Sequence, residues 1–475
     1  MSTHVIVVGG GPVGVATALD CARRGFEVTV VERETEIHPL PRAIVMDDEI
    51  QRALTLAGAE GIDTVTSPLD GAEFIDTTGA RIIGIDVPDG MVTALGFPPV
   101  VRYYQPELEA FLRERAAAAG VRLLLGQEVT AVSQSDSGVE AALASSAVLR
   151  GSWLVAADGA ASPIRKALGV HFDSLGFDQD WLVVDVRLHD GAGPALPTLV
   201  QQICDPARPS TYVPGHDRFR RWEFQLQEGE SREDMIRPER VWGLLSPWIT
   251  DADAEIVRAV VYRFHATVAS SLRVGRVFIA GDAAHQMPPF LGQGLCSGVR
   301  DAVNLSWKLQ LVEAGLAGER LLDTYDEERR PHATGVVAHA ADMGRLIDQL
   351  AGRGSEHEDL DDAYGGQRPF PDLEHGFLAG EHPLVGRQMP DITLADGRRF
   401  DDAAGDGFAI VIPAGRQPGA GELASWMDLG AVVLEGEVPF AEGVVVVRPD
   451  RCIAAVSATD DEFIDHTTTL MELLS

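Results

Sequence analysis

Residues 4–33, HVIVVGGGPVGVATALDCARRGFEVTVVER, decide the fold. A run rich in β-branched residues from Val5 to Val8 ends in Gly9-x-Gly11-x-x-Gly14, and a helical pattern follows. Such a run is typical of a strand that is buried on both faces. A second apolar run, from Glu27 to Val31, ends at Glu32. The stretch therefore predicts a Rossmann-like strand–turn–helix–strand unit in an α/β protein.

The glycines of this unit suit a nucleotide pyrophosphate. Gly9 permits the tight turn, Gly11 lets the backbone approach the phosphates, and Gly14 lets the helix pack close to the sheet. The start of the helix offers unpaired N–H groups to the phosphates, and Glu32 can accept hydrogen bonds from an adenosine ribose. The motif does not separate FAD from NAD. The predicted cofactor-binding residues of the unit are Gly9, Gly11, Pro12, Gly14, Glu32 and Arg33.

A second cofactor segment lies at 274–294, VGRVFIAGDAAHQMPPFLGQG. An apolar strand ends at Gly281-Asp282, where a carboxylate can accept hydrogen bonds from ribityl hydroxyls. The irregular loop that follows suits close approach of backbone to a flat ring, and a helix over 298–309 would point its N-terminal dipole at a reduced flavin. A nicotinamide dehydrogenase usually completes its cofactor site within one contiguous domain, so this distant segment favours FAD.

Composition excludes several classes of function. The chain has 475 residues, which suggests two or three domains, and a formal net charge of −33. So acidic a chain is a poor partner for nucleic acid or an anionic membrane. The four cysteines lie far apart with no CxxC pair, which predicts reduced thiols in a cytoplasmic protein and neither a disulfide framework nor a metal site. No run approaches the roughly 20 apolar residues that span a bilayer.

The motifs resemble those of class A flavoprotein monooxygenases, the FAD-dependent aromatic hydroxylases. The shared features are the glycine motif with Glu32, a middle motif Asp158-Gly159-Ala-Ala-Ser162-Pro-Ile-Arg165, and Gly281-Asp282-Ala-Ala-His285 with Pro288. The resemblance covers about residues 1–340 and implies FAD, NADH or NADPH, molecular oxygen and a small aromatic substrate. Within the family, the chain is most similar to the 3-(3-hydroxyphenyl)propionate hydroxylase branch, through PRAIVMDDE (41–49), RRWEFQLQEGE (220–230), FLGQGLCSGVRDAVNLSWKL (290–309) and VVRPDRCIAAV (446–456).

The resemblance also assigns roles to residues. It places Arg42 by the flavin phosphates or ring, with a surface ion pair to Asp47 or Asp48 as the alternative, and Gln105 on the FAD, with an exposed helix-start amide as the alternative. Arg165 is expected to brace its loop, with donation to the phosphate of the nicotinamide cofactor as the alternative. Further predicted cofactor contacts are Asp158, Gly281, Asp282, Pro289, Gly292, Gly294 and Leu295.

The predicted catalytic residues are His265, His285 and Pro288. His265 is expected late in a strand, where it could contact a phenol oxygen or be a satisfied core histidine. His285 could act in catalysis or hold the loop. Strands are predicted over 182–187, 221–226 and 260–265, and Tyr212, Arg220 and Arg221 could meet a carboxylate-bearing substrate.

The expected domains alternate along the chain. Residues 1–75, 101–171 and 274–350 form an FAD-binding domain of the glutathione-reductase type, and 76–100 and 172–273 form a substrate-binding sheet domain. Residues 351–379 read as a linker, and 380–475 resemble the thioredoxin-like tail domain of the branch. Without a CxxC, the tail is expected to serve structure or formation of a homodimer.

The resemblance implies hydroxylation of a phenol, such as a 3-(3-hydroxyphenyl)propionate-like acid, by oxygen added at flavin C4a. Two alternatives remain. One is a hydroxylase of aromatic polyketides or antibiotics in the same family. The other is a catalytically idle protein that binds FAD.

Overall fold

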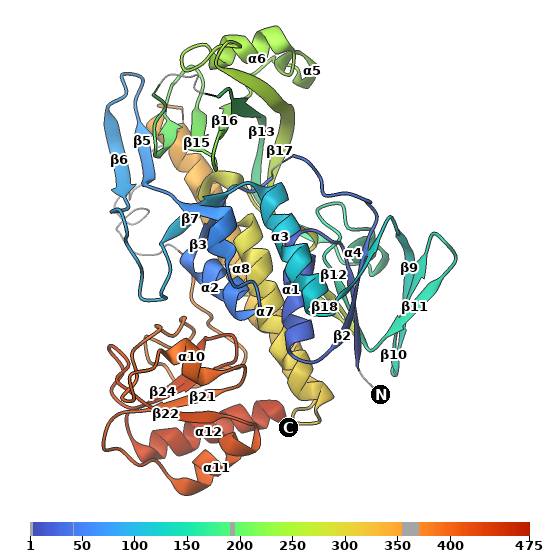
Figure 1. The fold of residues 1–475 in the computed structure, drawn as a ribbon, viewed down its shortest axis with the longest axis vertical. Coiled ribbons are helices and arrows are strands. Elements are labelled where there is room, and N and C mark those ends of the chain that lie inside the picture. The colour runs from blue at the N-terminus through green and yellow to red at the C-terminus, as the bar shows by residue number, and fades with distance from the viewer. Residues whose placement is uncertain (1–2, 41, 191–194, 354–369) are drawn as a thin grey trace.

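The computed structural model describes residues 3–40, 42–190, 195–353 and 370–475. The chain forms an FAD-binding domain in the middle of the molecule, a mostly antiparallel sheet domain above it and a small α/β domain below it in the view of Figure 1. Because the FAD-binding domain is assembled from separate stretches of chain, its strands and helices carry several colours in Figure 1. Among the described residues, no helix is long and apolar enough to cross a membrane.

The FAD-binding domain is built on a six-stranded sheet in the order β18-β19-β12-β1-β2-β8. Strand β1 pairs in parallel with β2 and with β12, and β12 pairs in parallel with β19. The carboxyl ends of β1, β12 and β19 therefore lie side by side at one edge of the sheet. The strands are β1 His4–Val8, β2 Glu27–Glu32, β8 Arg122–Leu125, β12 Trp153–Ala156, β18 Arg273–Val274 and β19 Val277–Ile279.

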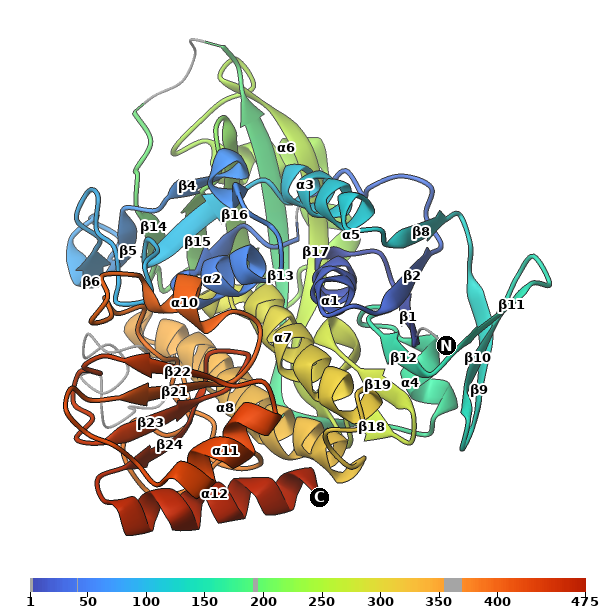
Figure 2. The same ribbon diagram turned by 60° about the horizontal axis from the view of Figure 1, so that its bottom comes forward.

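Helices cover this sheet because their apolar faces match its buried β-branched strands. Helix α1 packs against both α3 and α7, and α7 packs against α8. Figure 2 shows α7 and α8 running side by side, with α1 seen nearly end-on next to α7. The helices of this part are α1 Pro12–Arg23, α2 Asp48–Leu56, α3 Gln105–Ala118, α4 Pro163–Ala167, α7 Gly294–Glu313 and α8 Arg320–Leu350.

Smaller elements surround the domain. A three-stranded antiparallel sheet lies in the order β11-β10-β9, and another lies in the order β3-β7-β4. Their strands are β3 Val45–Asp47, β4 Thr66–Pro68, β7 Val100–Tyr103, β9 Val129–Ser135, β10 Gly138–Leu143 and β11 Val148–Gly151. The short 3-10 helices are η1 Ile62–Val65, η2 Gly281–Ala283 and η3 Pro289–Leu291.

The sheet domain has eight strands in the order β20-β17-β13-β16-β15-β14-β5-β6. Strands β13, β16 and β17 contain nearly all of the three stretches predicted as strands. Strand β5 belongs to this sheet, so the sheet domain begins at Gly71, before the expected boundary at residue 76. The strands are β5 Gly71–Ile75, β6 Arg81–Asp86, β13 Phe172–Leu188, β14 Val200–Ile203, β15 Ser210–Pro214, β16 Phe219–Gln225, β17 Ala254–Ala269 and β20 His285–Gln286.

The two faces of this sheet differ in character. We call the face that carries Leu182, Val184 and Val186 the outer face; these side chains pack with α5 Arg232–Met235 and α6 Pro238–Leu245. Because side chains alternate along a strand, Trp181, Val183 and Asp185 lie on the opposite, inner face. There Trp181 packs with Met343 and Ile347 of α8. The inner face is therefore the one that meets the FAD-binding domain.

The C-terminal domain contains a four-stranded sheet in the order β22-β21-β23-β24. Strand β21 pairs in parallel with β22 and antiparallel with β23, and β23 pairs antiparallel with β24. Apolar side chains fill both sides of this sheet, where helices and the preceding loop cover it. Its elements are α10 Phe400–Ala404, β21 Ala409–Ile412, α11 Ala420–Asp428, β22 Val432–Glu435, β23 Val444–Val447, β24 Ile453–Ser457 and α12 Asp460–Leu474.

The segment expected as a linker takes part in the core where it is described. Residues 354–369 of that segment lie outside the described residues. Phe377 is fully buried, and its ring lies edge-on to Trp307 of α7 with centroids 5.6 Å apart. Trp307 also contacts Phe408 of the C-terminal domain, again at 5.6 Å. These three rings join the C-terminal domain to the FAD-binding domain.

Candidate active site

The glycine turn after β1 has the geometry that a pyrophosphate site needs. A Cβ on Gly14 would lie 2.0 Å from the carbonyl oxygen of Gly9, so only glycine lets α1 approach the strand this closely. A Cβ on Gly11 would meet no atom within 4 Å. The space beside Gly11 is therefore open, and a phosphate can approach the first turn of α1 there. This contrast matches the separate roles predicted for the two glycines.

The acid at the end of β2 holds the same turn. Glu32 accepts hydrogen bonds from the amide of Gly10 at 2.6 Å and from the amide of Glu34 at 2.9 Å. Arg33 beside it is exposed and pairs with Glu34. Arg113 of α3, which no sequence motif singles out, donates to the carbonyl of Gly10 at 2.8 Å and so braces the turn from the other side. Its position in a helix far along the chain gave no signal in the sequence.

In the motif at residues 281–285, one acidic side chain is exposed within an otherwise buried segment. Gly281, Ala283, Ala284 and His285 are buried, whereas Asp282 is exposed. Gly281 adopts a φ of +62°, a left-handed conformation that favours glycine, and its amide donates to Asp301 at 3.0 Å. The turn therefore presents the Asp282 carboxylate outward at the carboxyl end of β19.

His285 is held in a buried ionic network. Its Nε2 lies 2.7 Å from Asp301 Oδ2, and neither side chain is exposed. Arg329 of α8 donates to the other oxygen of Asp301 at 2.9 Å. Burial alone would raise the pKa of Asp301, but His285 and Arg329 outweigh it, and the pKa is lowered. This geometry agrees with the alternative predicted for His285, that it holds the loop.

The loop after His285 leads into helix α7. Pro288 is buried and precedes the 3-10 turn η3, which contains Pro289. Gly292 adopts a φ of +65° and packs against Val45, so the loop touches the strand that follows Arg42. Helix α7 begins at Gly294, earlier than the start expected near residue 298. Gly294 and Leu295 therefore lie in the first turn, where helix amides are free to meet a negatively charged group.

Gln105 and Arg42 lie together. The side-chain oxygen of Gln105 accepts hydrogen bonds from the amides of Arg42 at 2.7 Å and of Ala43 at 2.9 Å. The Arg42 side chain is exposed and forms no ion pair within the described part of the chain. The alternative of an ion pair with Asp47 or Asp48 is therefore not what the described residues show, and Asp47 is instead paired with Arg300 at 2.7 Å. Gln105 thus fixes the backbone that presents the Arg42 guanidinium.

The middle motif, residues 158–165, contacts the loop that contains Gly281 and His285. Asp158 accepts hydrogen bonds from the Ser162 hydroxyl at 2.6 Å and the Ile164 amide at 3.2 Å, and burial raises the pKa of the Asp158 carboxyl. Arg165 is buried, donates to the carbonyl of Ala283 at 3.2 Å, and lies over the ring of Phe172 at 3.6 Å. Arg165 therefore braces the loop, as expected.

The residues predicted to meet substrate are divided between the two faces of the sheet. Arg221 lies on the inner face, where it donates to Asp185 at 2.7 Å and to the carbonyl of Arg42 at 2.9 Å. Arg220 pairs in register with Val186 and donates to backbone carbonyls near the strand end. Tyr212 is fully buried among the outer-face residues. The structure thus brings Arg221 to the cofactor side but not Tyr212 or Arg220.

His265 lies near the end of β17. Its Nδ1 forms a hydrogen bond with the carboxylate of Asp178, and both side chains are 41% exposed. Asp178 and His265 are paired in register and lie on the same face. His265 is therefore satisfied by a neighbouring strand and is not in contact with the glycine motifs.

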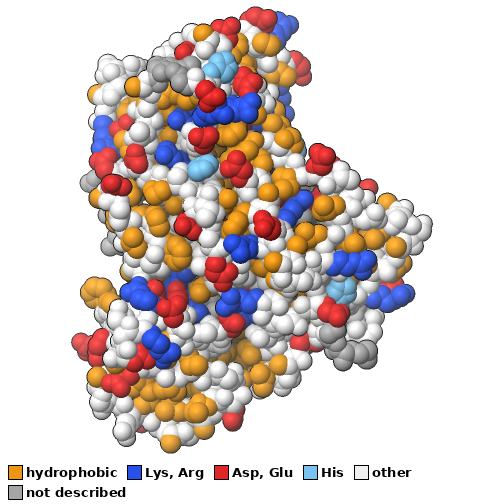
Figure 3. Space-filling view, viewed as in Figure 1, with side chains coloured by type: hydrophobic (Ala, Val, Ile, Leu, Met, Phe, Trp, Pro, Cys, Tyr) orange, Lys and Arg blue, Asp and Glu red, His pale blue; other side chains and the backbone are white. Residues whose placement is uncertain are grey.

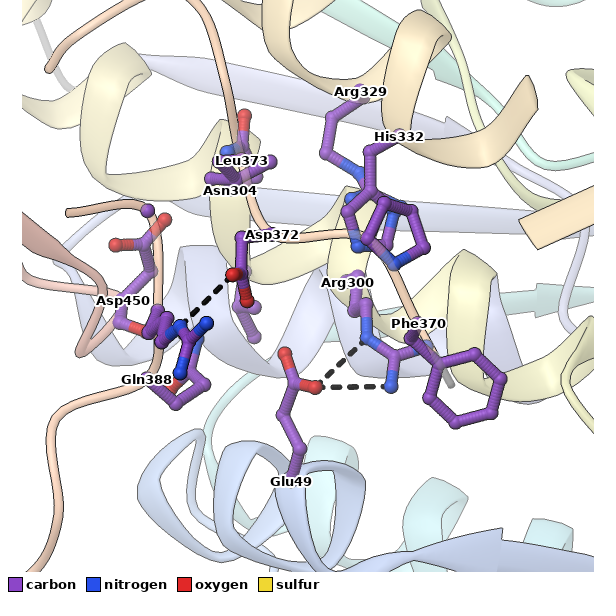
Figure 4. Close-up of a pocket in the computed structure, with 14 residues that line it drawn as sticks. Glu49, Arg300, Asn304, Arg329, His332, Phe370, Asp372, Leu373, Gln388 and Asp450 are labelled. Atoms are coloured by element: carbon purple, nitrogen blue, oxygen red, sulfur yellow. Dashed lines mark hydrogen bonds and ion pairs between the residues drawn. The ribbon is translucent and has the colours of Figure 1, made fainter. Parts of the chain in front are cut away.

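A separate cavity of about 80 Å³ lies between the FAD-binding domain and the C-terminal domain. Figure 4 shows Glu49 and Arg300 paired at its side, with Arg329 and His332 of α8 nearby. None of the glycine-motif residues lines this cavity. A polar space of this size suits a few water molecules. Figure 3 shows acidic and basic side chains mixed on the face of the molecule seen in that view.

Comparison with known proteins identifies the family to which the chain belongs. The model of a family described as FAD binding domain matches residues 2–340. The chain belongs to the FAD-dependent class A flavin monooxygenases. This flavin monooxygenase is 34% identical over 424 residues to a probable NADH-specific resorcinol 4-hydroxylase of Rhodococcus jostii (strain RHA1), covering 86% of this chain and 79% of that protein. It is 32% identical over 522 residues to a 3-(3-hydroxy-phenyl)propionate/3-hydroxycinnamic acid hydroxylase of Escherichia coli (strain K12), covering 96% and 92%.

The flavin monooxygenase also shares its fold with solved structures. Aklavinone-11 hydroxylase, solved with FAD and aklavinone, aligns with a TM-score of 0.84 at 24% identity and covers 99% of both chains. The flavin-dependent monooxygenase PieE, solved with FAD and substrate, aligns with a TM-score of 0.81 at 23% identity, covering 100% of this chain and 99% of that one. The predicted α/β fold of the FAD-binding hydroxylases is thereby confirmed. The residues present fit FAD, because the open space at Gly11 and the exposed carboxylate of Asp282 lie at the carboxyl ends of strands in one sheet.

Proposed function

We propose that this protein hydroxylates a small phenolic aromatic with NADH or NADPH and molecular oxygen. The observation that carries the proposal is the meeting of three motifs at the adjacent carboxyl ends of β1, β12 and β19. A 3-(3-hydroxyphenyl)propionate-like acid is the first candidate substrate, because the match to the hydroxylase of that acid spans nearly the whole chain. NADH is the first candidate reductant, since a relative is named as NADH-specific.

FAD supplies the redox and oxygen chemistry when it is bound, and the protein supplies orientation and electrostatics. In this proposal the first turn of α1 and Glu32 hold the adenosine end, and Asp282 accepts hydrogen bonds from the ribityl chain. Arg42 provides positive charge near the phosphates or ring. The backbone between Pro288 and Leu295 lies against the ring, and the N-terminal dipole of α7 favours negative charge there.

The C-terminal domain has a supporting role in this proposal. Its strand order and the helical connection between the parallel strands β21 and β22 support the proposal of a thioredoxin-like domain. Its cysteine, Cys452, is buried, and burial raises the pKa of the thiol, which argues against redox chemistry there. We infer a structural role for this domain, and a homodimer is the assembly to test.

The first test is NADH oxidation by the FAD-loaded protein, with and without 3-(3-hydroxyphenyl)propionate or resorcinol. A true substrate is expected to speed NADH oxidation severalfold and to yield a dihydroxylated or trihydroxylated product. Stimulation by larger polycyclic phenols alone would instead support the polyketide hydroxylase alternative. A protein that binds FAD but responds to no phenol would support the idle FAD-binding alternative.

A further inference from the structure

Glu223 is a buried carboxyl group on the inner face of the sheet. It lies in β16 and pairs in register with Val183 of β13, so it shares the face that meets the FAD-binding domain. The residue is only 5% exposed. Because glutamate is almost never buried unless it is paired, the groups around this carboxyl decide what it does.

The carboxyl of Glu223 accepts no hydrogen bond from any other residue in the described part of the chain. Thr211, which lies opposite it on β15, donates its hydroxyl to Gln202 instead, at 2.6 Å. Nη1 of Arg221 lies 3.8 Å from Glu223 Oε1, which is beyond hydrogen-bond distance. Neither carboxyl oxygen is among the fully enclosed polar atoms that lack a partner, so both oxygens border open space.

Glu223 lies between two covered positions of β16. On one side, Arg221 donates from Nη1 to the carbonyl of Arg42 at 2.9 Å. On the other side, the Gln225 amide donates to Asp348 of α8 at 3.2 Å. Since alternate residues of a strand share a face, the Arg42 loop and α8 flank the open space at Glu223. A ligand in that space would therefore lie next to the loop that presents Arg42.

The charges around this space favour an uncharged hydrogen-bond donor. Burial raises the pKa of the Glu223 carboxyl, although Arg221 lowers it. A more basic carboxylate is a stronger acceptor, and its hydrogen bonds are charge-assisted. Asp185 on the same face already pairs with Arg221 and Arg258, so those two cations are neutralised. A carboxylate brought beside Glu223 would be repelled, whereas a hydroxyl would be attracted.

We propose that Glu223 accepts a hydrogen bond from a second, uncharged hydroxyl group of the aromatic substrate. The carboxylate thereby selects dihydroxylated aromatics over phenols that carry a carboxylate at this position. This inference rests on the proposed function and narrows its substrate class. Of the two phenols in the first test, resorcinol fits the position and 3-(3-hydroxyphenyl)propionate is disfavoured there.

The experiment compares Glu223→Gln with wild type, both loaded with FAD. Glutamine keeps the size of the side chain and can still accept from a hydroxyl, but without charge. The Kd values of resorcinol, 3-methoxyphenol and 3-(3-hydroxyphenyl)propionate are measured from the change that each causes in the flavin absorbance, which requires no turnover. In 3-methoxyphenol the second hydroxyl has lost its hydrogen. The control is Glu140→Gln, which removes an exposed carboxylate of β10, far from this sheet.

In Glu223→Gln we expect the Kd of resorcinol to rise about tenfold and that of 3-methoxyphenol to change less than about twofold, because a hydrogen bond to a charged group is worth more than one to a neutral group. The Kd of 3-(3-hydroxyphenyl)propionate should fall, since the like charge is gone. Glu140→Gln should keep the wild-type values.

Equal changes in the Kd of resorcinol and of 3-methoxyphenol would overturn the inference and leave the proposed function standing. Wild type alone gives a second test that needs no variant to fold: binding of resorcinol no tighter than that of 3-methoxyphenol would also overturn the inference. If no phenol perturbs the bound flavin or stimulates NADH oxidation in wild type, the proposed function itself has failed, and this inference with it.

Discussion

At the scale of the residue, two glycines three positions apart meet opposite demands. Gly14 must leave room for the carbonyl of Gly9, whereas Gly11 borders open space. One glycine therefore serves packing and the other serves approach of the ligand. Substitution of each glycine should separate these two roles.

We expect Gly11→Ala to keep the fold and lose cofactor affinity. Its added methyl group meets no protein atom, so the melting temperature of the apoprotein should change little, while the Kd for FAD should rise at least about tenfold because the methyl group occupies the approach to the phosphates. Gly14→Ala should instead lower the free energy of unfolding by about 1–3 kcal/mol or more through overpacking. Thermal unfolding and quenching of FAD fluorescence measure the two effects. Equal loss of stability in both variants would contradict this division.

At the scale of the element, residues of helices α7 and α8 hold the turn at residues 281–285 in place. Asp301 of α7 accepts from Gly281, from His285 and from Arg329 of α8. One buried carboxylate therefore fixes the turn that presents Asp282. Helix α7, which begins at Gly294, therefore also holds the turn that precedes it in the chain.

We expect Asp301→Asn to be strongly destabilising, because it leaves Arg329 buried without its counter-charge. Breaking a buried ion pair costs about 3–5 kcal/mol, which urea unfolding would measure. Asp323→Asn is the matched control, since the Asp323 side chain is 61% exposed and its pair with Arg273 is worth about 1 kcal/mol or less. Similar losses of unfolding free energy in the two variants would show that the contacts of Asp301 do not stabilise the turn at Gly281.

At the scale of the whole molecule, buried charges join the C-terminal domain to α7 and α8. Glu328 accepts from Arg448 of the C-terminal domain at 2.8 Å and lies 3.0 Å from Lys308, and all three side chains are fully buried. Burial would raise the pKa of Glu328, but Arg448 and Lys308 outweigh it and lower that pKa to about 2. We therefore expect the two domains to unfold together.

The lowered pKa of Glu328 predicts how the unfolding free energy depends on pH. The carboxyl of Glu328 has a pKa of about 2 in the folded protein, against an ordinary glutamate value of 4.5 in the unfolded chain. Its contribution to stability is therefore complete above pH 4.5 and declines as pH falls toward 2. Lys308 stays protonated in this range, because burial lowers its pKa only to about 8. We expect the unfolding free energy of wild type to fall by about 1 kcal/mol per pH unit more than that of Glu328→Gln between about pH 4.5 and 3.

The matched control for this prediction is Glu327→Gln, whose parent side chain is exposed at the preceding position of α8. It should keep the slope of wild type in denaturant unfolding at each pH. Parallel curves for wild type and Glu328→Gln would contradict the assignment of the lowered pKa to this carboxylate.

The sequence by itself determined the cofactor and the frame of the fold. The informative patterns are local: the glycine spacing, the acid Glu32, and Gly281-Asp282 at the end of a strand. A β-branched run that ends in a glycine-rich turn is compatible with few folds other than a dinucleotide-binding unit. The glycine roles at Gly11 and Gly14 follow from this local geometry.

Only the tertiary structure decided which side chains of the sheet face the FAD-binding domain. Alternation along β16 separates Arg220 from Arg221, but the sequence does not say which of them points inward, because that depends on the register with distant strands. The partner of His285, the brace from Arg113 and the contacts on either side of Glu223 each join residues from separate elements. Contacts of this kind form only when those elements pack together, and therefore no local sequence pattern predicts them.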